Sequence, residues 1–282
     1  TNWNAAQQLL EIPAPSVSGN HETIIIDELS STHHYFMGIK TIDDRNNLSS
    51  LSNVVDTTTV DNILPALAIL YPSTGSTLHA GYMDSIQWTA SDLSGINYSK
   101  VLFSTNFGES YSLVDSVIGN DTGIYTLNSW PVPNVISEGC VIKVEVVDNN
   151  DLINSTQTLG NFSINDITAP TVSVINPSLG SIYHEYDTLE ISWSALDNIG
   201  IDSLVISFNR GEDDSWITIN TNPANSGNYD WAIPYGTVTE LGKIFIEAFD
   251  ESGNSIISES GGFFSIIDNT QPTVELQTPV EG

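Results

Sequence analysis

The sequence contains very few basic residues: six Lys and Arg stand against 35 Asp and Glu in 282 residues, a formal net charge of −29. Nucleic-acid phosphates require a basic protein surface, and an anionic membrane surface attracts basic segments. The composition therefore argues against nucleic acid and against a charged membrane surface as partners, and it favours cations. So acidic a chain repels itself unless counter-ions or bound metal neutralise part of its charge.

Cysteine and long apolar runs are also scarce. Cys140 is the only cysteine, so the chain cannot form an internal disulfide. It begins the apolar-leaning segment 140–147, where we interpret it as a small buried hydrophobic residue rather than a catalytic thiol. No apolar run approaches the ~20 residues that a membrane-spanning helix needs, so we expect no direct insertion into a membrane.

Catalytic motifs are missing too. The sequence has no G-x-S-x-G, no H-E-x-x-H and no phosphate-binding loop, and its acids are so widely spread that no acid–base pair stands out. His79 and His184 occupy equivalent positions without a second nitrogen or thiolate ligand nearby, which predicts exposed turn residues rather than a transition-metal site. We therefore expect that the chain is not an enzyme.

What the sequence does contain is an acidic linker that occurs three times. In each copy an Asp precedes a Pro by four residues, and a second Pro follows seven residues later. The copies are Asp61, Pro65 and Pro72; Asp166, Pro170 and Pro177; and Asp268, Pro272 and Pro279. Because the residue before proline avoids the helical region, and an alternating run follows, each copy predicts the opening strand of a new sheet.

Between the linkers the chain repeats a whole unit. Trp88 and Asp92 recur at the same spacing as Trp193 and Asp197. Short alternating runs, turn signals and the absence of a helical period predict an all-β sandwich. The strands "IQWTASD" at 86–92 and "ISWSALD" at 191–197 resemble those of immunoglobulin-like modules strung along large prokaryotic surface proteins. The resemblance implies immunoglobulin-like modules at 61–166 and 167–268, and the first strand of a further module at 269–282.

Residues 1–60 have a different pattern, in which segments 22–29 and 34–42 predict strands. The block "HYFMGIKTIDDRNNLSSLSNV" at 34–54 resembles the last two strands of a bacterial or archaeal fibronectin type III domain. A full sandwich of this kind needs ~90–100 residues, so we expect a partial domain whose first strands are missing. These strands either lie upstream or come from another chain. The predicted fold class is all-β: tandem immunoglobulin-like and fibronectin type III sandwiches in a beads-on-a-string array.

The linker acids predict a cation site at each joint. In such a sandwich the entering linker lies at the same end as two acidic loops, one after the Trp strand and one after the segment ending at 148. The candidate ligands are Asp61, Asp92, Asp148 and Asp151 in the first module, and Asp166, Asp197, Asp202 and Asp250 in the second. Ca²⁺ takes six to eight oxygen ligands, and a bound Ca²⁺ would lock the angle between neighbouring modules. The alternative is that Asp and Asn recur here because they suit turns.

These observations predict a non-catalytic extracellular segment of a prokaryotic cell-surface protein, with a structural or interaction role. A surface layer, a sheath, a filament and an adhesin stalk all fit this description. The expected partners are copies of the chain or other surface proteins, with glycans as a further class. Two alternatives stay open: accessory spacer modules of a secreted hydrolase, and carbohydrate-binding modules that use Trp130 and Trp231.

Overall fold

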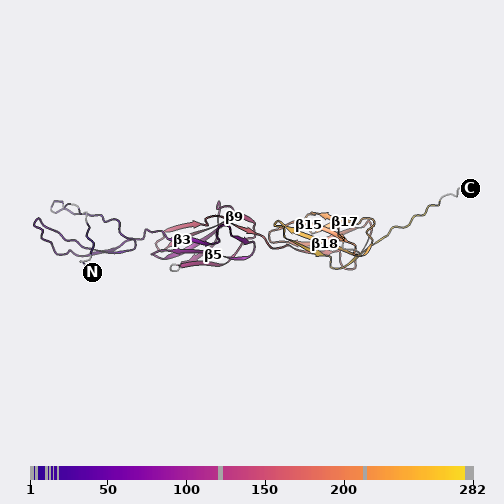
Figure 1. Cartoon of the computed structure of the whole chain (residues 1–282), viewed down its shortest axis with the longest axis horizontal. Helices are drawn as coiled ribbons and strands as arrows, with labels where there is room; N and C mark the ends of the chain where they lie inside the picture. The colour runs from indigo at the N-terminus through magenta and orange to yellow at the C-terminus, as the bar shows by residue number, and fades with distance from the viewer. Residues whose placement is uncertain are drawn as a thin grey trace.

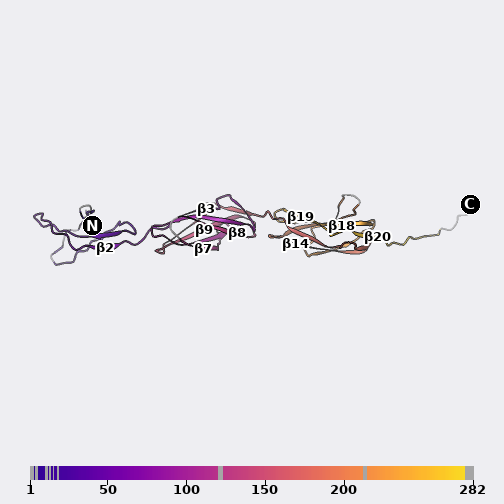
Figure 2. The ribbon, with the colours of Figure 1, turned by 90° about the horizontal axis from the view of Figure 1, so that it is seen from below.

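The computed structural model describes residues 3, 6–9, 12, 14, 16, 17, 19–119, 123–211 and 215–276. The described chain is an elongated row: an N-terminal unit, two β-sandwiches and an extended C-terminal segment follow one another along one axis (Figure 1). The view from below shows the same single file (Figure 2). Its named elements are all strands, which agrees with the predicted all-β class, and no helix in the described part is long and apolar enough to cross a membrane.

The first sandwich packs a three-stranded sheet against a six-stranded one. The smaller sheet has the order β3 (Ala66–Tyr71), β5 (Met83–Ser91), β8 (Gly123–Pro131). The larger sheet has the order β4 (Thr77–His79), β11 (Phe162–Asn165), β9 (Ser137–Asp148), β6 (Ile96–Ser104), β7 (Ser112–Ile118), and β10 (Ile153–Gln157) also pairs with β9. Along β5 the buried residues alternate as Ile86, Trp88 and Ala90, because successive side chains of a strand point to opposite faces.

The second sandwich repeats this topology strand for strand. Its smaller sheet has the order β12 (Thr171–Asn176), β14 (Thr188–Leu196), β17 (Asn228–Ala232). Its larger sheet has the order β13 (Ile182–His184), β20 (Phe264–Ile267), β18 (Thr239–Asp250), β15 (Ile201–Asn209), β16 (Ile217–Thr221), and β19 (Ser255–Glu259) pairs with β18. The equivalent Trp residues of the two modules therefore occupy the same place on equivalent strands.

Tryptophans form the centre of both cores. Trp88 is fully buried and its Nε1 donates a hydrogen bond to Ser99 Oγ at 3.2 Å. Trp130 and Trp231 are also buried, at 3% and 7% exposure, and each ring lies against a core Phe, at 5.1 and 4.9 Å between centroids. The hypothesis that these two side chains form a carbohydrate platform is therefore wrong, because neither presents an open face to a sugar. Cys140 is fully buried, as its apolar strand predicts.

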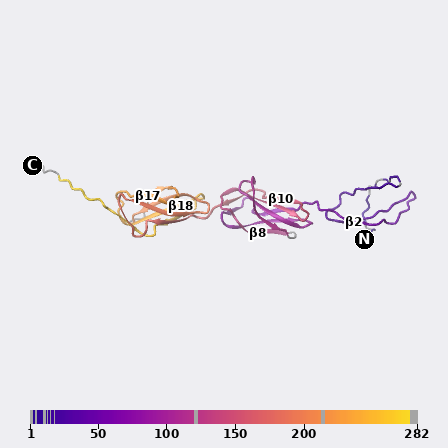
Figure 3. The same cartoon turned by 180° about the vertical axis from the view of Figure 1, so that it is seen from behind.

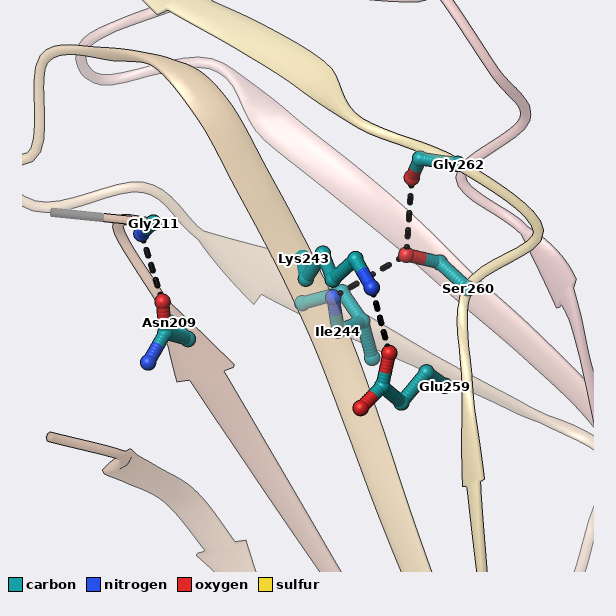
Figure 4. A network of polar contacts seen from close by, with 7 residues as sticks. All are labelled: Asn209, Gly211, Lys243, Ile244, Glu259, Ser260 and Gly262. Carbon is teal, nitrogen blue, oxygen red and sulfur yellow. Dashed lines mark hydrogen bonds and ion pairs between the residues drawn. The ribbon is translucent and has the colours of Figure 1, made fainter. Parts of the chain in front are cut away.

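Cross-strand polar contacts hold β19 to β18 at an edge of the second sandwich (Figure 4). Lys243 on β18 forms an ion pair with Glu259 on β19. Ser260 Oγ accepts a hydrogen bond from the backbone N–H of Ile244 at 3.3 Å and donates one to the carbonyl of Gly262 at 3.1 Å. These contacts fix the strand that leads away from the acidic loop at the end of β18.

The N-terminal unit is only partly sheet. β1 (His34–Met37) and β2 (Val55–Thr58) form an antiparallel pair, and apolar side chains such as Ile25 and Ile39 remain exposed around it. The strand predicted at 22–29 does not form. In the described chain no partner strand lies beside this segment, and a strand needs a neighbour for its backbone hydrogen bonds.

The C-terminal segment is the extended tail of Figures 1 and 3. Residues 269–276 are exposed and pair with no strand of the described chain. Residues 277–282, the rest of the predicted opening strand of a further module, lie outside the described residues.

Candidate metal centre

Each sandwich gathers three carboxylates at the end where the linker enters. Asp61 from the linker, Asp92 after β5 and Asp148 at the end of β9 form the first group, and one oxygen of each lies within 4.8 Å of the others. The second group meets the same criterion; it consists of Asp166 from the linker, Asp197 after β14 and Asp250 at the end of β18. We call these groups the joint 1 cluster and the joint 2 cluster. The structure thus brings together six of the eight predicted ligands.

One oxygen of each loop acid stabilises its own turn. Asp148 Oδ1 accepts hydrogen bonds from the backbone N–H groups of Asn150 and Leu152, at 2.8 and 2.9 Å. Asp197 Oδ1 accepts two in the same way, from Ile199 and Gly200, at 2.8 and 3.0 Å. This is the local backbone bonding that makes Asp common in turns. For Asp148 and Asp197 the turn interpretation therefore accounts for one oxygen of the side chain and leaves the other unexplained.

Several of the remaining oxygens are buried without a hydrogen-bond partner. Within the described residues these atoms are Asp148 Oδ2 in the joint 1 cluster and Asp166 Oδ2, Asp197 Oδ2 and Asn198 Oδ1 at joint 2. Leaving a buried polar atom unsatisfied costs about 1–3 kcal/mol, and more when the group is charged. Asp148 is fully buried and Asp166 is only 5% exposed, so solvent does not remove this cost. At each joint, a cation held between the carboxylates would give these buried oxygens a partner.

The linker acids are fixed by contacts on both sides. The backbone N–H of Ile63 donates to Asp61 Oδ1 at 3.1 Å, Ser31 Oγ of the N-terminal unit donates to the same oxygen at 2.9 Å, and Asn150 Nδ2 donates to Oδ2 at 3.3 Å. These donors, chiefly the Ile63 N–H, lower the pKa of Asp61 to about 2. Asp61 is therefore an anion throughout the physiological pH range.

At joint 2 the linker acid is held by a backbone group and an amide. Asp166 Oδ1 accepts a hydrogen bond from the N–H of Thr168 at 3.0 Å and one from Asn198 Nδ2 at 3.2 Å. Asn254 Nδ2 donates to Asp250 Oδ2 at 2.8 Å and to the carbonyl of Asp166 at 3.4 Å. The linker is thus bonded to both acidic loops of the module that it enters.

Two predicted ligands lie outside the clusters. Asp151 is exposed and sits in a left-handed turn conformation, with φ of 65°. Asp202 is exposed on β15, one residue after the strand begins. The structure places neither in a group of possible metal ligands among the described residues, and the same holds for His79 and His184.

Two of the polar neighbours, Ser31 and Asn254, did not stand out in the sequence, whereas Asn198 directly follows the predicted ligand Asp197. Ser31 belongs to another unit of the chain, so no local pattern could reveal its contact with Asp61. Asn198 and Asn254 do carry a signal, because they lie one and four residues after a cluster acid, in loops that the topology brings to the linker.

Residues 170–242, within the second sandwich, match the family model described as Bacterial Ig domain. No curated protein matches. Similar solved structures include the fibronectin(III)-like modules of Clostridium thermocellum CbhA, at 16% identity over 76% of this chain and 100% of that chain, with a TM-score of 0.31.

Two further solved structures are also similar to the chain. A tetra-tandem repeat from the extending region of a large adhesion protein is 13% identical over 83% of this chain and 57% of that chain, with a TM-score of 0.38. The insect immune protein hemolin is 12% identical over 81% of this chain and 62% of that chain, with a TM-score of 0.39. Residues 170–242 are thus similar to a bacterial immunoglobulin-like domain, and the two sandwiches share one all-β topology.

Proposed function

We propose that the chain is a non-catalytic structural segment of a prokaryotic cell-surface protein, in which Ca²⁺ bound at the joints stiffens a row of β-modules. One observation carries the proposal. The same three-acid cluster, built from a linker and the two loops of the module that it enters, occurs at both joints, and each cluster contains at least one buried carboxylate oxygen without a partner.

The chemistry of the clusters favours Ca²⁺ over other common metal ions. All the side chains of the two clusters offer oxygen, and neither cluster contains His or Cys among the described residues. Zn²⁺ and the later transition metals prefer nitrogen and sulfur ligands. Mg²⁺ requires near-ideal octahedral geometry and keeps several waters, whereas Ca²⁺ accepts flexible sets of carboxylate, amide and carbonyl oxygens. Ligands from three separate segments suit the less demanding ion.

The mechanical effect follows from how short the joints are. At joint 2 Asp166 comes directly after Asn165, the last residue of β11 in the first sandwich. An ion bound by Asp166, Asp197 and Asp250 would therefore tie the first module to the second with no free residue between the strand and the ligand. At joint 1 Asp61 comes three residues after the end of β2, and Ser31 of the N-terminal unit already contacts it.

The surface of the chain agrees with this role. A net charge of −29 keeps neighbouring rods apart and attracts cations. We propose an extracellular location, as part of a surface layer, sheath, filament or adhesin stalk, with copies of the chain or other surface proteins as partners. Glycans remain a further class of partner, through surfaces other than the buried Trp130 and Trp231.

The experiment compares the chain in millimolar Ca²⁺ with the chain in excess chelator. We expect Ca²⁺ to raise the melting temperature and to narrow the distribution of end-to-end distances seen by small-angle X-ray scattering. Asp166→Ala should reproduce the chelator's effect at joint 2 in the presence of Ca²⁺. Asp202→Ala is the matched control, since this acid lies in the same module outside the cluster. Identical scattering and melting with and without Ca²⁺ would refute the proposal.

A further inference from the structure

The two clusters have the same number of carboxylates but different neutral neighbours. The residue after Asp197 is Asn198, and the residue at the equivalent place after Asp92 is Leu93. Leu93 is 74% exposed and has no side-chain oxygen. Asn198 Nδ2 lies 3.2 Å from Asp166 Oδ1, and its Oδ1 is buried without a hydrogen-bond partner.

The amide of Asn198 can present its oxygen to a cation without any change of the backbone. The oxygen and nitrogen of an Asn amide have nearly the same shape, so a half-turn of the group exchanges their places. With no cation in the cluster, the nitrogen faces Asp166 and donates to it. With a cation beside Asp166, the oxygen takes that place as a ligand. This half-turn of the amide gives up the hydrogen bond to Asp166 and moves the nitrogen into the place where the oxygen has no partner. The bond between the oxygen and the cation offsets both losses.

At joint 1 the linker acid is already engaged by other donors. Asp61 Oδ1 accepts from Ser31 and Ile63, and its Oδ2 accepts from Asn150 Nδ2 at 3.3 Å. Asn150 is exposed, so water competes for its amide. Among the described residues the joint 1 cluster has one buried oxygen without a partner, while joint 2 has three such oxygens, counting Asn198.

From this difference we infer that Asn198 is a fourth protein ligand at joint 2, and that joint 2 binds Ca²⁺ more tightly than joint 1. The inference rests on the proposed function, since it assigns a ligand and an order of affinity to the same two sites. Ca²⁺ affinity depends on the number of ligands and on the rigidity of the site. With equal numbers of acids, the Asn198 amide and the number of buried oxygens without a partner decide the order of affinity. As the Ca²⁺ concentration falls, joint 1 loses its ion first and becomes flexible, while joint 2 keeps the two sandwiches rigidly connected.

The test is calorimetric titration of the full chain with CaCl₂. The wild type should show two classes of site. Asp166→Asn should remove the tighter class and Asp148→Asn the weaker one. Asn198→Ala should weaken the tighter class tenfold or more, and Asn198→Asp, which keeps an oxygen at that place, should keep it tight. Leu93→Ala is the matched control at the equivalent position and should change neither class.

The outcomes separate this inference from the proposed function. If Asp148→Asn removes the tighter class, if the two sites bind equally, or if Asn198→Ala leaves the tighter class unchanged, the inference is overturned while the joints still bind the ion. If the wild type takes up no Ca²⁺, the proposed function fails with it. Circular dichroism in chelator establishes that every variant is folded, so a lost site is not a lost fold.

Discussion

Asp197→Asn is the substitution that best separates a metal ligand from a turn residue. The Asn side chain keeps Oδ1, which accepts the backbone N–H groups of Ile199 and Gly200. It replaces only Oδ2, which is buried without a partner, by an amide nitrogen. The turn is therefore preserved while one negative charge is removed from the joint 2 cluster.

The size of the effect follows from the spacing of the acids. Two full charges 4.8 Å apart, the outer limit within the cluster, repel by about 3.5 kcal/mol at an effective dielectric constant of about 20. Asp197 takes part in two such pairs, so removing its charge relieves about 7 kcal/mol before screening. Salt and the partial exposure of Asp197 reduce this to about 1–2 kcal/mol. In chelator we therefore expect Asp197→Asn to raise the melting temperature of the second module by at least about 4 °C.

In Ca²⁺ we expect Asp197→Asn to reduce the stabilisation that the bound ion confers on the folded state. An ion present at 100 times its Kd stabilises the folded state by about 2.7 kcal/mol, and tenfold weaker binding leaves about 1.4 kcal/mol. The increase in melting temperature on adding Ca²⁺ should therefore be smaller for Asp197→Asn than for the wild type. Differential scanning calorimetry of the full chain, with and without chelator, measures both quantities.

The control is Asp202→Asn, which removes an exposed charge from the same module outside the cluster. It should change neither the melting temperature in chelator nor the increase in melting temperature on adding Ca²⁺ by more than about 1 °C, because isolated surface charges contribute little to stability. If Asp197→Asn behaves like Asp202→Asn, the cluster acids are turn residues and the reasoning is wrong. A lower melting temperature in chelator would show that Oδ2 makes a stabilising contact in the absence of metal.

Three further predictions concern single groups. The folded-state pKa of Asp61 is lowered from its usual 3.8 to about 2. Its stabilising contribution is therefore complete above about pH 4 and is lost as the pH falls towards 2. Asp61→Asn should make the melting temperature depend less on pH over that interval, and an unchanged slope would contradict this. Trp88→Ala should destabilise the first sandwich by about 3–5 kcal/mol and leave the calorimetric transition of the second in place, whereas a common shift would show that the modules unfold together. Burial raises the pKa of the Cys140 thiol, so a thiol reagent should label it only in denaturant, and rapid labelling of the folded chain would refute its burial.

Much of the fold could be predicted from local patterns. The alternation along 86–92 and 191–197 is a period of two, which a strand with one buried face requires whatever surrounds it. The repeated Trp and Asp positions then imply that both modules share one topology, and that topology puts linker and loops at the same end. For this reason each of the two sets of four acids predicted from the sequence contains the three acids that the structure brings together.

Local sequence patterns did not predict features that depend on long-range contacts. Segment 22–29 carries a run of Ile typical of a strand but forms none, because a strand's hydrogen bonds come from a neighbouring strand that can be distant in sequence. Trp130 and Trp231 lie on β8 and β17, the edge strands of the two smaller sheets, and both are nevertheless buried. Burial depends on which sheet packs over a residue, and that is a long-range property.

The sequence by itself determined the repeat, the β class and the positions where acids enter the joints, because these depend on periodicity and on proline. Only the tertiary structure decided which oxygen of each acid is used by a turn and which is left buried and unpaired. It also excluded Asp151 and Asp202 from the clusters, and it placed Asn198 against Asp166. Side-chain direction in a loop changes with a single backbone angle. Contacts between loops form only once the strands that flank them are paired in the sheet.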